Sequence, residues 1–133
     1  MIVTAGIPQT PSVPKGYLFC KNAEIVYDLA QCCCEVCPKA LIGVLTDPVN
    51  SIVPLICEVQ KRNKCYEEKR VFGIIASHMN RASTFVAERM SLDPAGVIVP
   101  VTGGCSPSTI VPVLSQTKPL FSHTSSFFSV ITL

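Results

Sequence analysis

Two features of this sequence could do chemistry: a cysteine that follows a glycine pair, and a histidine three positions before an arginine. Gly103 and Gly104 let the backbone turn sharply, so Cys105 is presented at a bend. A reactive thiol there would form a site, and an inert thiol at a simple bend is the alternative. His78 and Arg81 fall on the first turns of a predicted helix and share one face. That face is either part of a binding site or a solvated polar surface.

Two further patterns admit both a binding and a structural interpretation. Asp47 lies between an apolar run and a proline, where it either places an acceptor in a cleft or marks a helix N-terminus. Four cysteines lie within one predicted helix, namely Cys32, Cys33, Cys34 and Cys37. Successive helical residues point about 100° apart, so we expect at most two of the four to share a face. A tetrahedral zinc site would need further ligands, and we interpret the four as core thiols.

The elements that must position these residues follow from hydrophobic periodicity. Apolar runs of strand length lie at residues 2–5, 41–45 and 71–75. Helical patterns lie at residues 18–37, about 50–61 and 79–90. This alternation indicates βαβ crossover units and a parallel sheet. β-Branched segments at residues 97–101 and 109–113 flank the glycine pair and predict an antiparallel hairpin.

The polar residues gather at one edge of this predicted sheet. Residues 6–16 contain three prolines and are predicted to form a loop after the first strand. Ligands of such sheets bind beyond the carboxyl ends of the strands. The polar residues just past those ends are Gln9, Lys15, Asp47, His78 and Arg81.

Composition bounds the class of protein. The 133 residues suffice for one domain with a real core, and the net charge of +2 gives no argument for nucleic acid or a membrane surface. No apolar run approaches the roughly 20 residues that span a bilayer. The first residues form neither a signal nor a transit peptide, and the chain begins inside a predicted strand, so we expect it to be incomplete. With nothing to mark secretion, the eight cysteines are interpreted as reduced thiols of an intracellular protein.

Five segments, in order, carry a resemblance to one family. They are TAGIPQTP, TDPVNSIVP, FGIIASHMNRASTFVAE, LDPAGVIVPVTGG and STIVPVLSQ. Together they resemble NAD-dependent malate dehydrogenase of the mitochondrial and bacterial type, over residues 2–119. The resemblance implies an α/β fold: the C-terminal half of a Rossmann-like parallel sheet with flanking helices, then the start of the catalytic domain as an antiparallel hairpin. It implies a partial NAD-binding domain at residues 1–77, the start of the catalytic domain at 78–118 and a divergent tail at 119–133.

The resemblance also assigns the substrate-handling positions. In the family a histidine accepts the hydroxyl proton of malate, an aspartate orients that histidine, and arginines grip the carboxylates. The histidine position falls at Cys105 and the aspartate position at His78. Of three arginine positions, two are substituted by Gln9 and Lys15, and the third is retained as Arg81. A thiol is a poor substitute for imidazole near neutral pH, and His78 brings no negative charge.

NAD is the implied cofactor, and malate and oxaloacetate are the implied substrates. The cofactor positions fall at Asn22, Leu45, Thr46 and Asp47. Asp47 also takes the place of the family's substrate-binding asparagine, where a carboxylate would repel a dicarboxylate. The sequence contains no Gly-x-Gly, so the glycine-rich loop that cradles pyrophosphate is absent. We expect no metal site.

These substitutions predict a truncated malate dehydrogenase-like protein without meaningful dehydrogenase activity. One alternative is a non-catalytic module that pairs with a full-length malate dehydrogenase through the helices at residues 18–37 and 50–61. Another is that Cys105 and His78 touch, as the family's pair would, and that the thiolate acts as a nucleophile. The first strand, open on one side, favours aggregation or a partner. The resemblance implies a mitochondrial location, and a cytoplasmic one is the alternative.

Overall fold

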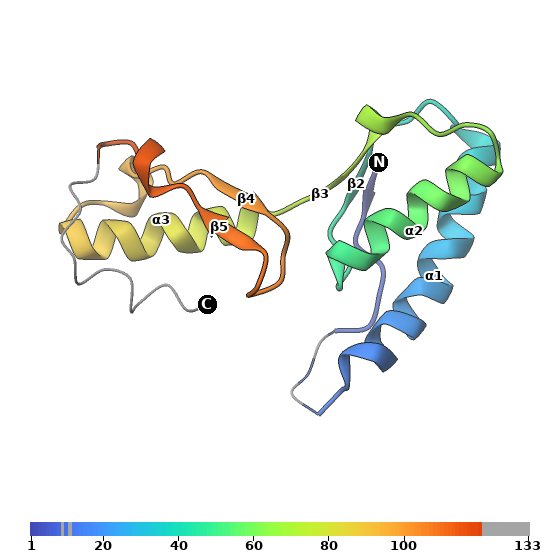
Figure 1. The fold of residues 1–133 in the computed structure, drawn as a ribbon, viewed down its shortest axis with the longest axis horizontal. Coiled ribbons are helices and arrows are strands. Elements are labelled where there is room, and N and C mark those ends of the chain that lie inside the picture. Colours follow the sequence, from blue (N-terminus) through green and yellow to red (C-terminus); the bar gives the residue numbers. More distant parts are fainter. Residues whose placement is uncertain (9, 11, 121–133) are drawn as a thin grey trace. The chain divides into compact units, whose positions relative to one another are not determined.

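The computed structural model of the chain describes residues 1–8, 10 and 12–120, and the predicted tail therefore lies largely outside the described residues. The chain divides into two compact units, residues 1–74 and 75–133, and each is described by itself (Figure 1). No described helix combines the length and the apolar character needed to cross a membrane.

The first unit is built on a three-stranded parallel sheet. Its strands are β1 (Ile2–Val3), β2 (Ile42–Val44) and β3 (Val71–Gly73), hydrogen-bonded in the order β1-β2-β3. Each predicted strand exists, two residues shorter than its apolar run. The central strand is buried along its whole length, as expected of a continuous apolar run in a parallel sheet. In the described part of the chain β1 pairs on one side only, and Ile2 on it is 66% exposed.

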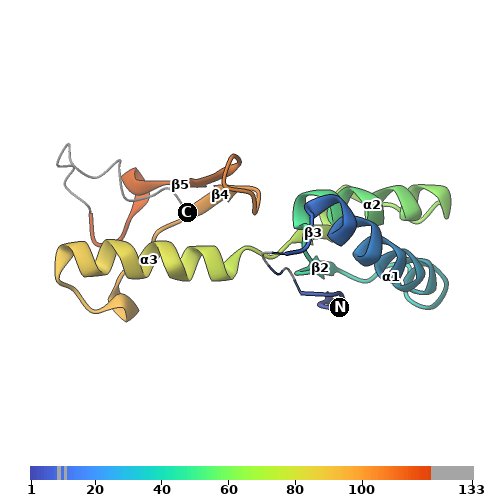
Figure 2. The same cartoon turned by 90° about the horizontal axis from the view of Figure 1, so that it is seen from below.

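Two helices connect the strands and pack with the sheet into one core. They are α1 (Lys15–Val36) and α2 (Val49–Arg62), which lie side by side (Figures 1 and 2). Right-handed crossovers between strands in sequential order put both helices on the same face of the sheet. The core consists of Val3, Val26, Ala30, Cys33, Ile42, Val44, Ile52, Ile56, Val59 and Val71. The short 3-10 helix η1 (Glu68–Arg70) leads into β3.

The first helix begins within the predicted loop. Pro14 is the N-cap residue of α1, and its carbonyl accepts the first helical hydrogen bond from the Leu18 N–H at 3.1 Å. The last proline of the loop therefore starts the helix rather than prolonging the loop, because its fixed φ of −60° suits entry into a helix.

The cysteine-rich end of α1 packs against the core. Cys33 is buried in the core, Cys34 and Cys37 pack against it, and Cys32 is exposed. The interpretation as core thiols is thus confirmed for three of the four. Of these three, only Cys33 and Cys34 lie within α1. Cys37 is its C-cap residue, with φ −141°, and packs against the core from just beyond the helix.

The second unit joins a helix to a hairpin. Helix α3 (Ala76–Met90) is followed by the 3-10 helix η2 (Pro94–Gly96), the antiparallel strands β4 (Val101–Gly103) and β5 (Ile110–Pro112), and the 3-10 helix η3 (Leu114–Gln116). Its core consists of Ala82, Val86, Ala87, Val97 and Val99. The predicted hairpin is confirmed, but its first strand lies further along the chain than expected. Strand β4 overlaps the expected residues 97–101 only at Val101, because Pro100 has no N–H to donate and Ile98 pairs with Lys118 instead.

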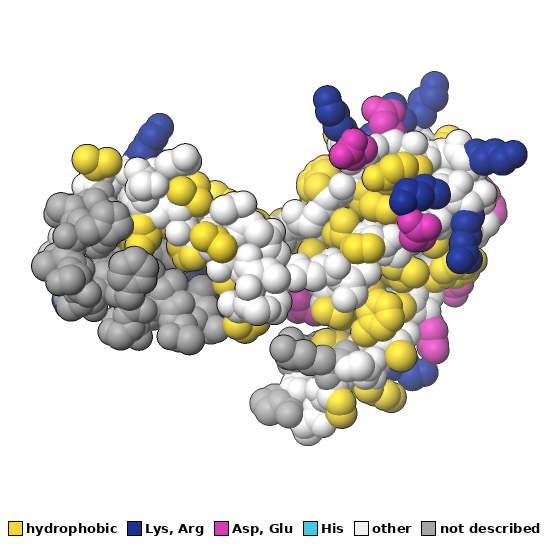
Figure 3. Space-filling view, viewed as in Figure 1, with side chains coloured by type: hydrophobic (Ala, Val, Ile, Leu, Met, Phe, Trp, Pro, Cys, Tyr) yellow, Lys and Arg dark blue, Asp and Glu magenta, His cyan; other side chains and the backbone are white. Residues whose placement is uncertain are grey.

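Charged side chains of both signs are interspersed over the first unit on the face shown in Figure 3. Opposite charges pair along the chain, at Lys21–Glu24 (3.2 Å), Glu58–Lys61 (2.6 Å) and Glu67–Arg70 (2.6 Å). Local pairing of this kind leaves no one-signed patch on that face, in keeping with the small net charge.

Candidate functional site

Asn22 joins the two loops that follow β1 and β2. The Ile7 N–H donates to Asn22 Oδ1 at 2.7 Å, and Asn22 Nδ2 donates to the Asp47 carbonyl at 2.6 Å and the Ile7 carbonyl at 3.4 Å. The side chain is 0% exposed. Both ends of the amide are therefore committed to the protein backbone at the carboxyl edge of the sheet.

The same edge is closely packed around Gly6. A Cβ at Gly6 would lie 2.8 Å from Thr46 Cγ2 and 2.9 Å from Asn22 Oδ1, so the position requires a residue without a side chain. Thr46 is buried, and its hydroxyl donates to the Ala5 carbonyl at 2.8 Å. The loop after β1 is thus fixed against β2 by side chains rather than by ladder hydrogen bonds alone.

Leu45 and Asp47 are the predicted site residues that remain accessible at this edge. Leu45 is 45% exposed, and Asp47 is exposed at the end of the loop before α2. The N-cap residue of α2 is Pro48, so Asp47 stands outside the helix rather than capping it. Of the substituted arginine positions, Gln9 lies outside the described residues, and Lys15 is the first residue of α1.

His78 and Arg81 occupy the first turns of α3, as the sequence predicted. Arg81 is exposed and His78 is half-buried. His78 Nδ1 is buried and has no hydrogen-bond partner among the residues described. A buried ring nitrogen without a partner is uncommon, because such an atom loses its hydration without compensation.

Cys105 is the second residue after the end of β4, and it lies half-buried in the turn of the hairpin. The Gly104 N–H donates to the Thr109 carbonyl at 3.2 Å, which closes the turn around it. Gly103 has φ +89°, and a Cβ there would lie 1.8 Å from the Thr109 carbonyl oxygen. Glycine is therefore required at the bend. His78 and Cys105 belong to the same unit, and their contact stays a prediction.

The side chains predicted to meet a cofactor are of two kinds. Those of Asn22 and Thr46 are buried and bonded to backbone, whereas Leu45 and Asp47 are accessible. No Gly-x-Gly is present to bring backbone N–H groups close to a pyrophosphate. These residues therefore fit NAD only in part. Within the described residues no group of three or more His, Cys, Asp or Glu side chains is arranged to hold a metal ion.

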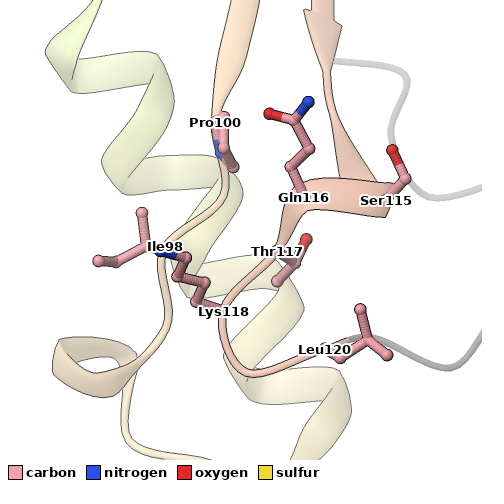
Figure 4. Close-up of a pocket in the computed structure, with 7 residues that line it drawn as sticks. All are labelled: Ile98, Pro100, Ser115, Gln116, Thr117, Lys118 and Leu120. Atoms are coloured by element: carbon pink, nitrogen blue, oxygen red, sulfur yellow. The ribbon is translucent and has the colours of Figure 1, made fainter.

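A cavity in the second unit was not indicated by any sequence pattern. A cavity of about 670 Å³ lies beside η3, lined by Ile98, Pro100, Ser115, Gln116, Thr117, Lys118 and Leu120 (Figure 4). Thr117 is 2% exposed, and its hydroxyl has no partner among the described residues. Likewise, no periodicity or motif indicated that Asn22 would clamp two loops.

The fold of the first unit defines a class of protein: β1-α1-β2-α2-β3 is half of a doubly wound, nucleotide-binding α/β sheet. The family model described as "lactate/malate dehydrogenase, NAD binding domain" matches residues 1–73. The chain belongs to the lactate/malate dehydrogenase family.

Relatives and solved structures agree with this assignment. Peroxisomal malate dehydrogenase 1 of Arabidopsis thaliana is 42% identical over 132 residues, which are 99% of this chain and 37% of the relative. Mitochondrial malate dehydrogenase of Homo sapiens is 43% identical over 119 residues, 90% of this chain and 35% of the relative. The structure of a Cryptosporidium parvum lactate dehydrogenase complexed with lactic acid and NAD matches with a TM-score of 0.74 and 26% identity, covering 88% of this chain and 36% of that chain. The chain thus spans about a third of the length of the relatives it matches.

Proposed function

We propose that this chain is a malate dehydrogenase-related protein that does not interconvert malate and oxaloacetate. The observation that carries the proposal is the residue at the glycine bend. Cys105 stands where the resemblance places the histidine that accepts the hydroxyl proton of malate. An ordinary thiol has a pKa of about 8.5, so near neutral pH it is mostly protonated and cannot take up that proton.

The partner of that position is also changed. His78 stands at the position of the orienting aspartate, and its Nδ1 is buried without a hydrogen-bond partner in the described part of the chain. An imidazole supplies no negative charge to stabilise a cation formed during proton transfer. Catalytic residues that act together have non-additive effects, so these two changes together remove most of the dehydrogenase rate.

The substrate and cofactor positions support the same conclusion. Asp47 presents an exposed carboxylate where the resemblance places an asparagine, and it would repel a dicarboxylate. Arg81 is exposed and available to a carboxylate, but Gln9 lacks a charge and Lys15 lacks the planar fork of arginine. We expect weak NAD binding by these residues, because the Asn22 amide is committed to backbone.

Steady-state kinetics with oxaloacetate and NADH test the proposal. The chain and its Cys105→Ala variant should give the same rate, equal to that without protein. Turnover of the unchanged chain above the Cys105→Ala control overturns the proposal. Circular dichroism of both proteins shows that the comparison is between folded chains, and titration of NADH fluorescence measures cofactor binding separately from turnover.

A second candidate is a non-catalytic module that pairs with a full-length malate dehydrogenase, and it is favoured by the outer surface of α1. Apolar side chains on that helix are exposed: Tyr17 (54%), Ile25 (38%), Leu29 (39%) and Val36 (78%). A helix face of this kind is typical of an interface between subunits. Mixing with human mitochondrial malate dehydrogenase and size-exclusion chromatography should give a mixed species. A monodisperse monomer that does not co-elute argues against this candidate.

Two further properties of the family, a catalytic domain and a mitochondrial location, are proposed for this chain. Residues 78–118 would form the start of the catalytic domain, and the location would be mitochondrial, as the names of several relatives state for those proteins. Fluorescence microscopy of the tagged chain tests the location, and a diffuse cytoplasmic signal would contradict it.

A further inference from the structure

The C-terminal part of α1 is tied to the segment that follows α2. Gln31 Nε2 donates to Asn63 Oδ1 at 3.3 Å, and Asn63 Nδ2 donates back to Gln31 Oε1 at 3.0 Å. Asn63 is further held by a hydrogen bond from its Nδ2 to the Val59 carbonyl at 2.9 Å. This reciprocal pair fixes the distance and register between the helix and the segment after α2.

Each of these two residues is followed closely in the sequence by a cysteine. Cys34 follows Gln31 by three positions, on the same face of α1. Cys65 follows Asn63 by two positions, after a sharp turn at Lys64, which has φ +56°. The Cys65 N–H donates to the Gln60 carbonyl at 3.0 Å, which fixes the backbone of the second cysteine.

The two thiols interact. Burial, and then the hydrogen bond and charge of Cys65, raise the pKa of the Cys34 thiol to about 12. Both cysteines are half-buried free thiols, so a small reagent can reach them, whereas Cys33 beside them is buried in the core. Proximity, a fixed backbone and partial access are the properties of a cysteine pair that can be oxidised.

We propose that Cys34 and Cys65 form a reversible disulfide when the chain meets a low-molecular-weight disulfide such as oxidised glutathione. The Cys65 thiolate attacks one sulfur of the reagent, whose S–S bond breaks and releases one small thiol. Cys34 then gives up its proton and attacks the Cys65 sulfur of the mixed disulfide, releasing the second small thiol. The cysteine pair loses two electrons and two protons, and the reagent is reduced to two thiols.

The disulfide would close the segment from residue 34 to residue 65, which contains β2 and α2. It would thereby lock the interface between α1 and α2 that forms the core of the first unit. Oxidation would make this unit more resistant to unfolding, and reduction would return it to the free-thiol state. The proposal is independent of whether the chain has dehydrogenase activity.

The test is non-reducing peptide mapping by mass spectrometry after equilibration of the folded chain with oxidised and reduced glutathione. We expect one cross-linked peptide pair containing Cys34 and Cys65, and a higher thermal midpoint in the oxidised sample. Cys32→Ser, which changes an exposed thiol on the same helix, is the matched control and should leave both results unchanged.

Two variants separate this outcome from others. Cys34→Ser and Cys65→Ser should each abolish both the cross-link and the oxidation-dependent rise in thermal midpoint, and circular dichroism establishes that they fold. Glutathione attached to both cysteines without a cross-link overturns the proposal, as does a cross-link of either cysteine to a different one. If the oxidation-dependent rise in thermal midpoint persists in Cys34→Ser, the claim that this disulfide stabilises the first unit is overturned.

Discussion

Replacing Asn22 by alanine should unfold the first unit more readily, because that amide holds two loops at once. Asn22→Ala removes the acceptor of the Ile7 N–H and the donor to the Asp47 carbonyl, bonds of 2.7 and 2.6 Å at a side chain that is 0% exposed. A buried donor left without a partner costs about 1–3 kcal/mol, and a lost hydrogen bond about 1 kcal/mol. We therefore expect a loss of about 2–4 kcal/mol, a large share of the roughly 5–15 kcal/mol that stabilises an ordinary domain.

Urea unfolding followed by far-UV circular dichroism measures this loss. Asp28→Ala is the matched control, because it also places alanine in the middle of α1 but at an exposed position, and it should change stability by less than about 0.5 kcal/mol. Asn22→Asp keeps the acceptor for Ile7 but sets an oxygen against the Asp47 carbonyl, so at pH 7 it should cost at least as much as alanine. If Asn22→Ala unfolds at the same urea concentration as Asp28→Ala, the amide does not clamp the loops and the reasoning fails.

Three further predictions concern the bend, a helix end and a thiol. Gly103→Ala should cost about 2–4 kcal/mol in urea unfolding, because its Cβ would lie 1.8 Å from the Thr109 carbonyl oxygen at a φ of +89°; an unchanged midpoint would contradict the hairpin geometry. Lys64→Gly should stabilise by about 0.5–1 kcal/mol in the same assay, because a lysine at φ +56° bears a strain that glycine lacks, and a loss of stability would refute this. Burial and Cys65 raise the pKa of the Cys34 thiol to about 12, so the folded state holds that proton more tightly than the unfolded chain does. The contribution of this thiol to stability is therefore complete below its ordinary pKa of about 8.5 and is lost as the pH rises toward 12. Thermal midpoints of Cys34→Ser should fall less over that range than those of Cys32→Ser, and equal declines would exclude Cys34 as the cause.

The order of the elements could be predicted from sequence because it depends on local pattern. Apolar runs and helical spacing are properties of neighbouring residues, and all three strands of the first sheet and its two helices lie where they were expected. The ends of elements were less predictable. Whether Pro14 closes a loop or opens a helix depends on the residues that follow it, and how far β4 extends depends on a pairing between Ile98 and Lys118 that lies far along the chain.

In the candidate site, too, local features could be predicted from sequence and contacts between distant residues could not. That His78 and Arg81 share a helix, and that Cys105 stands at a bend, follow from spacing of three residues and from two glycines. Asn22 bonds to Ile7 and Asp47, which lie 15 and 25 positions away from it in the sequence. No local sequence pattern predicts such contacts. The exposure of Cys32, beside Cys33 and Cys34 that contact the core, was not predictable for a related reason, because the buried face of a helix is set by what packs against it.

A residue can resist replacement because the fold requires it or because the chemistry of the site requires it, and Asn22 belongs to the first kind. Asn22 needs no ligand in order to hold the two loops together, since both ends of its amide are bonded within the first unit. A library of variants selected only for folded expression should therefore reject substitutions at Asn22 and Gly6 while accepting many at Asp47, whose side chain is exposed. Drift can alter the chemistry of a site and leave its framework in place, because the framework alone is required for the chain to fold.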